Sequence, residues 1–333
     1  MDAAPVLLAD IGGTNARFAL AGLDPTVLDR DSIRTYAVAD FPSLADAAAH
    51  YRDETGTHVT RAVMAVAGRV EGDTARLTNH PWVISASRVR EALGLESLHL
   101  VNDFVAQSMA IRLLQPDDVV PIGASAWPTS SWSTPSAGAR TFAVVGPGTG
   151  LGVGGLLVRG GRWFPLATEG GHASFAPGTP EEIAILERLS LDYGRVSNER
   201  VVSGMGLVNL HRALSEIAGV DPGTLQPVDI TARAQAGDLR CQHAISVLCS
   251  VFGAIAGDLV LTLGAWDGVF LGGGLTKPLL SALQHSGFRQ RFEGKGRYAA
   301  AMARVPTFAI VHPYPGLLGA AALAADPDVI GEG

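Results

Sequence analysis

The stretch VLLADIGGTNARFAL at residues 6–20 decides the fold of this 333-residue chain. Its first six residues are an aliphatic run that predicts a strand, and Gly12-Gly13-Thr14-Asn15 then predicts a tight turn. The apolar residues 16–20 predict a second strand that follows the turn. Glycine lets backbone N–H groups approach a phosphate closely, and threonine adds a hydroxyl donor. This layout is typical of a phosphate-binding turn, although one copy is explained equally well as an ordinary hairpin.

The same layout returns about halfway along the chain. Residues 141–145 predict a strand, Gly146-Pro147-Gly148-Thr149-Gly150 a glycine-rich turn, and residues 151–158 a second strand. A third turn, Gly272-Gly273-Gly274, follows the predicted strand 269–271. Two copies with threonine and a third glycine cluster favour a nucleotide ligand. The repetition also predicts two related lobes that present their turns to a shared cleft.

Helical periodicity fills the intervals between the predicted strands. The predicted helices cover residues 43–53, 85–93, 103–114, 180–193, 204–218, 231–236 and 240–263. Because strands and helices alternate, the chain belongs to the α/β class. The Ser-, Thr- and Pro-rich segment 127–138 has neither period, which predicts a surface loop or a linker between lobes.

Composition narrows the classes of function. The formal charge of −7 gives no reason to expect a nucleic-acid partner. The two cysteines, Cys241 and Cys249, exclude a disulfide framework and a four-thiolate zinc site. The N-terminus lacks the features of a signal peptide, and the longest apolar run, 244–257, meets Asp258 before the ~18 residues that span a bilayer. We therefore expect a cytoplasmic protein without a membrane partner.

Two common nucleotide-binding folds do not fit the sequence. A Walker loop needs a lysine after its glycines, and the two lysines, Lys277 and Lys295, lie in other settings. Residues 150–155 match G-x-G-x-x-G, but residues 156–161 predict a strand and a turn where a dinucleotide-binding fold needs a helix. P-loop and Rossmann chemistry are excluded on these grounds.

Asn102 and Asp103 follow the predicted strand 98–101 and begin a predicted helix. Both are favoured helix N-caps, which is a sufficient structural reason for their presence. A carboxylate at the C-terminal end of a strand also lies where α/β folds bind ligands, and it could accept a proton from a hydroxyl that attacks a phosphate. Both interpretations of this pair stay open.

Glu169, His172 and Glu199 form a second polar set. A metal site is disfavoured because no third or fourth ligand has suitable spacing. Charged acceptors suit sugar hydroxyls, whereas a surface loop with incidental charges explains the same residues at least as well.

Several separated motifs together resemble bacterial glucokinases over nearly the whole chain. They are LADIGGTNAR (8–17), TNHPW (78–82), LVNDF (100–104), GTGLG (148–152), EGGH (169–172), ERVVSG (199–204) and PGLLG (315–319). The resemblance implies a two-lobed actin/hexokinase-like fold, a duplicated ribonuclease H-like architecture with the ligand cleft between its lobes. It implies a small lobe of residues 1–111 and 312–333 and a large lobe of residues 112–311. It further implies ATP-dependent phosphorylation of glucose to glucose 6-phosphate, with Mg²⁺, in a homodimer.

The resemblance also assigns roles to residues. Asp103 matches the catalytic base, which takes the proton of the C6 hydroxyl. The sugar-binding positions are Asn79, Asn102, Asp103, Glu169, His172 and Glu199. The nucleotide-binding positions are Ala9, Asp10, Ile11, Gly12, Gly13 and Thr14 in the first turn, Gly148, Thr149 and Gly150 in the second, and Gly272, Gly273 and Gly274 at the adenosine end. No residue is assigned as a direct metal ligand, since ATP carries the magnesium, near Asp10.

The sequence departs from the glucokinase pattern at two points, and alternatives remain for the substrate, the phosphoryl donor and the function. Pro147 stands in the second turn and removes one N–H donor there. The chain cannot form the Cys-rich zinc site of related sugar kinases, so His172 is expected to bind sugar. Fructose, mannose or an N-acetyl sugar are alternative substrates, polyphosphate or ADP are alternative donors, and a non-catalytic sugar sensor that binds ATP is an alternative function.

Overall fold

The computed structural model describes residues 5–22, 24, 26–78, 80–124, 138–326 and 329. The described strands form two large mixed sheets and one small sheet. The first sheet has the order β3-β2-β1-β4-β8. Its strands are β1 (Val6–Ile11), β2 (Asn15–Ala21), β3 (Leu28–Ala37), β4 (Arg61–Val66) and β8 (Ser97–Asn102). The small sheet contains β5 (Val70–Glu71), β6 (Thr74–Arg76) and β7 (Val83–Ser85).

The second sheet has the order β12-β11-β10-β13-β14-β9. Its strands are β9 (Val119–Pro121), β10 (Arg140–Pro147), β11 (Leu151–Arg159), β12 (Arg162–Ala167), β13 (Gly268–Leu271) and β14 (Thr307–Ile310). In each sheet the first strand of a hairpin, β1 or β10, pairs antiparallel with the next strand and parallel with a later one, β4 or β13. This shared topology is the duplication that the two glycine-threonine turns predicted.

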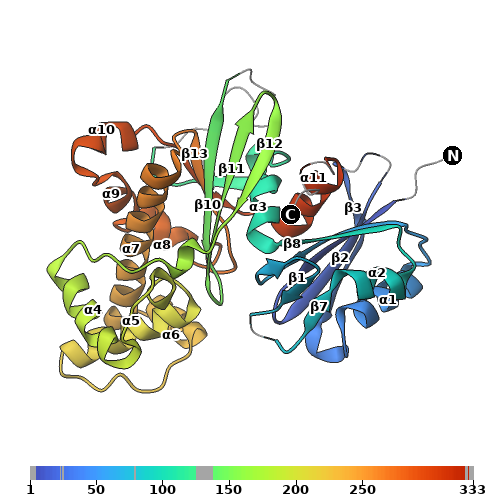
Figure 1. The fold of residues 1–333 in the computed structure, drawn as a ribbon. Helices are drawn as coiled ribbons and strands as arrows, with labels where there is room; N and C mark the ends of the chain where they lie inside the picture. The colour runs from blue at the N-terminus through green and yellow to red at the C-terminus, as the bar shows by residue number, and fades with distance from the viewer. Residues whose placement is uncertain are drawn as a thin grey trace.

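The helices lie on the outer faces of the two sheets and between them (Figure 1). Those beside the first sheet are α1 (Leu44–Thr55) and α2 (Ala86–Leu93). The helices of the large bundle are α4 (Pro180–Tyr193), α5 (Gly204–Ile217), α6 (Pro227–Gln235), α7 (Leu239–Leu263), α8 (Leu280–His285), α9 (Phe288–Glu293) and α10 (Ala299–Met302). Between the sheets lie α3 (Asp103–Ala110) and α11 (Pro315–Ala324).

The pair α3 and α11 belongs to a hydrophobic core that both sheets share. This cluster joins β1 and β4 of the first sheet to β10, β11 and β13 of the second. Glycines permit the close packing. A Cβ atom on Gly319 of α11 would overlap the carbonyl of Ala106 on α3, and one on Gly152 of β11 would overlap the ring of Phe104. The helix that begins with Asp103 is therefore held from both sides.

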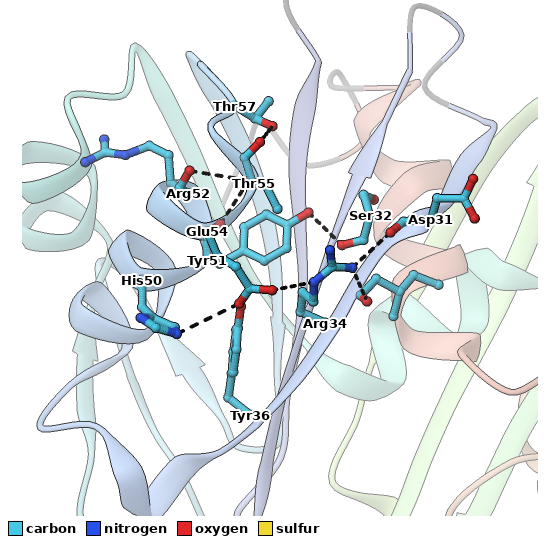
Figure 2. A network of polar contacts seen from close by, with 11 residues as sticks. Asp31, Ser32, Arg34, Tyr36, His50, Tyr51, Arg52, Glu54, Thr55 and Thr57 are labelled. Atoms are coloured by element: carbon cyan, nitrogen blue, oxygen red, sulfur yellow. Dashed lines mark hydrogen bonds and ion pairs between the residues drawn. The ribbon is translucent and has the colours of Figure 1, made fainter.

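A polar network fastens α1 to β3 at the edge of the first sheet (Figure 2). Glu54 on α1 accepts hydrogen bonds from Arg34 Nε at 2.6 Å and from the Tyr36 hydroxyl at 2.7 Å, both on β3. The buried Tyr51 donates its hydroxyl to the carbonyl of Ser32 at 3.0 Å. These bonds fix the helix that covers the outer face of this sheet.

The helix α7 corrects one expectation. By length and composition it could cross a membrane, because an 18-residue window within its 25 residues has a mean hydropathy of 2.1. The expectation that Asp258 leaves this apolar segment too short to span a bilayer was therefore wrong. However, 67% of that window is buried inside the protein, as in the core helix of a large lobe, so it is weak evidence for a membrane span.

Candidate active site

A cavity of about 290 Å³ is lined by residues that follow the carboxyl ends of parallel strands in both sheets. The predicted site residues that line it are Gly12, Gly13, Asn102, Asp103, Gly148, Thr149, Gly150, Glu169, His172, Glu199, Gly273 and Gly274. The folding of the chain thus gathers three turns and the two polar sets at one place. Ligands of α/β proteins bind at such an edge.

The other predicted site residues that the structure describes are not part of this lining. The side chains of Ala9 and Ile11 are fully buried in the core of the first sheet. Thr14 is exposed at the turn, where its carbonyl accepts the N–H of Val38 at 2.9 Å. Gly272 donates its N–H to the carbonyl of a residue in β10 at 3.0 Å, and so continues the sheet. Asn79 lies outside the described residues, as do residues 127–137 of the predicted loop.

Asn102 is the N-cap of α3. Its Oδ1 accepts the N–H of Phe104 at 2.8 Å and of Val105 at 3.3 Å, and its Nδ2 donates to the carbonyl of Gly68 at 3.1 Å. The carboxylate of Asp103 accepts the N–H of Phe104 at 3.1 Å. The capping that could have explained both residues therefore belongs mainly to Asn102. The carboxylate of Asp103 remains available to the cavity that it lines.

The pKa of Asp103 is raised to about 7. Burial is the largest cause, because it disfavours the charged form, and the nearby negative charges of Asp10 and Glu169 act in the same direction. The Phe104 N–H opposes them. A carboxyl group of this kind titrates close to neutral pH, which suits a general base.

Asp10 lies at the end of β1, beneath the first turn. Burial raises its pKa, and Arg17 opposes that change through an ion pair in which Arg17 Nη1 lies 3.3 Å from Asp10 Oδ2. A Cβ atom on Gly316, at the start of α11, would lie 2.5 Å from the Asp10 Cγ. The glycine is needed there because the helix N-terminus approaches this carboxylate closely.

Glu199 joins the second turn to the polar set. It lies in the short 3₁₀ helix Asn198–Arg200, and its Oε2 accepts the N–H of Leu151 at 3.0 Å. A Cβ atom on Gly150 would overlap that oxygen. The second turn and the Glu199 carboxylate are therefore in direct contact, so a ligand that moves one of them would also move the other.

The second and third turns touch through their backbones. A Cβ atom on Gly146 would overlap Gly272, and one on Gly273 would lie 2.5 Å from the carbonyl of Pro147. Pro147 is the last residue of β10 and is buried, and its carbonyl accepts the N–H of Leu275 at 2.9 Å. The proline that the sequence placed in a phosphate turn thus ends a strand and ties the two turns together.

Glu169 precedes the 3₁₀ helix Gly170–His172 and His172 ends it, and both residues are exposed at the cavity. The carbonyl of His172 accepts a hydrogen bond from Arg195 Nη1 at 3.0 Å. A Cβ atom on Gly171 would overlap the carbonyl of Leu151, so this segment lies directly against the second turn. The imidazole and the carboxylate are thus presented from a well-supported backbone.

Sequence reasoning missed part of the lining. The residues that it did not single out include Ala67, Gly68, Arg69, Gln107 and Thr168, and Thr78 was named only as part of a motif without a role. The first three follow β4, a parallel strand next to β1 that was not predicted. The apolar run of residues 62–66 and the glycine after it carried the signal for this turn.

A nucleotide and its metal ion fit this donor set. The turns offer glycine backbone without side chains, which leaves room for a phosphate chain. Among the described residues, no group of three or more His, Cys, Asp or Glu side chains is placed to hold a metal ion. Magnesium is often held by one or two carboxylates together with substrate phosphates, and Asp10 is a carboxylate at the first turn.

Comparisons with known proteins show what the chain is similar to. The glucokinase family model matches residues 7–327. A glucokinase of Stenotrophomonas maltophilia strain K279a is 64% identical over 326 residues, which cover 97% of this chain and 96% of that protein. The crystal structure of a glucokinase from an Antarctic psychrotroph superimposes with a TM-score of 0.82 at 34% identity, over 97% of this chain and 98% of that one.

A more distant structure shares the fold. A glucokinase from Balamuthia mandrillaris, determined in complex with glucose, superimposes with a TM-score of 0.73 at 23% identity, over 96% of this chain and 93% of that one. These superpositions confirm the predicted two-lobed α/β fold.

Proposed function

The chain belongs to the glucokinase family and is a phosphotransferase that phosphorylates glucose; from this premise we propose that ATP is the donor and that Asp103 is the general base. The observation that carries the proposal is the Asp103 carboxyl group. This group lines the cavity and its pKa is raised to about 7. Asn102, and not Asp103, makes most of the hydrogen bonds that cap the N-terminus of α3. A carboxylate with few structural hydrogen bonds is suited to chemistry.

Asp103 acts on the hydroxyl of the sugar. Its ionised form accepts the proton of the C6 hydroxyl while the hydroxyl oxygen attacks the γ-phosphate in line. The raised pKa makes this carboxylate a stronger base than an ordinary aspartate, which would hold a proton only below about pH 4. The product is glucose 6-phosphate, and Asp103 loses its proton to solvent before the next turnover.

Four polar side chains hold the sugar in the proposed complex. Glu169, Glu199 and His172 offer charged or polar acceptors at the cavity, and Asn102 keeps one amide hydrogen beyond its bond to Gly68. Hydrogen bonds to charged groups contribute about 1.5–3 kcal/mol each, enough for selective binding of a polyol. Asn79 is assigned to the same ligand by family resemblance.

The glycine turns hold the nucleotide. Gly12 and Gly13 are assigned to one part of the phosphate chain, Gly148 to Gly150 to another, and Gly272 to Gly274 to the adenosine end. Magnesium, when bound with ATP, would neutralise phosphate charge, and Asp10 would face it directly or through water. The protein's own contribution is to fix the donor, exclude water and keep the base in line.

The activity is tested by a matrix of sugars and phosphoryl donors. Purified protein is incubated with glucose, fructose, mannose or N-acetylglucosamine and with ATP, ADP or polyphosphate, and the sugar phosphate is measured. The proposal expects turnover that is highest with glucose and ATP. Turnover with ADP or polyphosphate but not with ATP would refute the donor assignment, and a missing product in every well would favour a sugar sensor.

Three further assignments complete the proposal. The small lobe comprises residues 1–111 and 312–333 and the large lobe residues 112–311. The protein acts in the cytoplasm, where glucose and ATP are available, and it forms a homodimer, as the family resemblance implies. Light scattering of the eluted protein tests the dimer, since a mass close to 34.6 kDa would show a monomer.

A further inference from the structure

Gln107 is a buried polar residue of the cavity that the mechanism above does not use. It lies on α3 four residues after Asp103, and its side chain lines the same cavity. Residues four apart lie on one face of a helix, so Gln107 stands about one turn deeper than the base. The residue is only 9% exposed.

The carboxamide of Gln107 makes no hydrogen bond within the described part of the chain. Its Oε1 is fully buried and has no partner there. The amide nitrogen is not buried to that degree, and the residue lines the cavity, so the nitrogen is the atom that a ligand can reach. The neighbouring Ser108 differs, because its buried hydroxyl donates to the carbonyl of Phe104 at 2.7 Å.

The position of the carboxamide indicates which ligand it meets. A Cβ atom on Gly272 would lie 2.5 Å from Gln107 Oε1, so the side chain lies against the start of the third turn. Gly272 in turn lies against Gly146, the first residue of the second turn. The unpaired amide is therefore located where the two turns assigned to the nucleotide come together.

The charge of the residues that line the cavity favours a neutral ligand-binding group near Asp103. Arg69 is the one residue with a permanent positive charge among the described residues that line the cavity. A cation close to Asp103 would lower the pKa of that carboxyl and weaken it as a base. A neutral amide binds phosphate oxygens without this effect. An apolar side chain would remove the unfavourable burial of Oε1 but could not bind a ligand.

We propose that Gln107 binds the phosphate chain of the nucleotide, with its amide nitrogen donating to a phosphate oxygen. The inference rests on the proposed function in one respect, that the donor is ATP. It adds a binding residue to the second and third turns that neither the glycine motifs nor the polar motifs contain.

The test compares the wild type with Gln107→Leu, Gln107→Met and the control Ser108→Ala. The KM values for ATP and glucose, kcat, and the thermal shift caused by ADP are measured for each protein. We expect both Gln107 variants to raise the KM for ATP about tenfold or more, because a hydrogen bond to a charged phosphate is lost. The KM for glucose should stay within about twofold, and the ADP-induced shift should shrink.

Stability provides a second readout. Without ligand, both Gln107 variants should melt at the wild-type temperature or above it, because each removes a buried acceptor that has no partner. Ser108→Ala should leave the KM for ATP unchanged. That control lies beside Gln107 on α3 and separates a local packing effect from loss of the amide.

Several outcomes would overturn the inference. One is a KM for ATP within about twofold of wild type in both Gln107 variants. Another is an equal rise in the KM for glucose. Loss of folding in both variants would also overturn it, since an unpaired amide contributes no stability that methionine lacks. A wild-type protein that consumes no ATP refutes the proposed function instead, and that result is obtained before any variant is compared.

Discussion

Replacing Asp103 by asparagine should stabilise the protein and nearly abolish its activity. Folding raises the pKa of Asp103 from 3.8 to about 7. A gap of about 3 pH units corresponds to at most roughly 4 kcal/mol, and because the carboxyl borders an open cavity we expect a destabilisation of about 2–4 kcal/mol. The folded protein therefore carries an ionised group that it would hold more favourably when protonated.

The sign of the pH dependence follows from the same pKa. Between about pH 4 and pH 7 the folded state binds the proton of Asp103 more tightly than the unfolded state, so this group's contribution to stability falls as the pH rises. Asparagine stays neutral throughout. The advantage of Asp103→Asn is thus greatest above pH 7 and less than half as large at pH 5.

Thermal unfolding and kinetics measure the two effects on one variant. At pH 8 the melting temperature of Asp103→Asn should rise by roughly 5 °C. Its kcat should fall by about 10²–10⁴-fold, whereas the KM for glucose should change less. The control Asp73→Asn should do the opposite at pH 8: Asp73 is exposed, and hydrogen bonds from Ser85 and Ser87 lower its pKa, so its loss should lower the melting temperature without changing kcat.

Two results would refute this reasoning separately. A melting temperature of Asp103→Asn that is unchanged or lower at pH 8, or a difference independent of pH, would show that burial does not raise the pKa as described. A kcat close to wild type would remove Asp103 from the role of general base even if the variant is more stable.

Three further predictions concern the site. With a base of pKa about 7, kcat/KM for glucose should fall about tenfold per pH unit below pH 7; a flat profile down to pH 5.5 would contradict the assignment of Asp103. Glu169→Gln should raise the KM for glucose about tenfold or more with a smaller effect on kcat, and an unchanged KM would make Glu169 a surface residue. Gly150→Ala should raise the KM for both substrates, because its Cβ displaces Glu199; steady-state kinetics with ATP and with glucose would show whether only one changes.

Much of the fold could be predicted because its signals are local. The helix predicted over 180–193 is α4 itself, since Thr179 caps it and Pro180 occupies its first turn. The helix α6 begins at Pro227, earlier than predicted, with a capping box from Gln226 to Asp229 that the periodicity did not reveal. Conversely, α3 ends at Ala110, because the last three amides before Leu114 change to shorter-range turn bonds.

Some residues of the candidate site could likewise be predicted from local sequence signals, and others could not. Glycine turns and the Asn102-Asp103 pair are readable because each is contiguous and follows a strand. Gln107 is not, because one glutamine in a helix pattern predicts an exposed side chain as readily as a buried one. Only the packing of α3 against β11 and the nearness of Gly272 make it a cavity residue. Such a role depends on contacts with segments that are distant from Gln107 in the sequence.

In the proposed mechanism, the place of α3 lets one carboxylate, that of Asp103, act between two ligands. Its hydrophobic contacts belong to the core shared by both sheets, and the glycines opposite it, Gly152 and Gly319, leave no space for it to shift. The turns and polar residues that we assign to the sugar and the nucleotide lie on loops around this helix. In the proposed mechanism, closure on the substrates would bring these loops to a base that the core already holds, whereas a base carried on a loop would have to be positioned anew in each cycle. Crowding at Gly319 should therefore affect kcat as well as stability, which a Gly319→Ala variant would reveal as a lower kcat at temperatures where the protein is still fully folded.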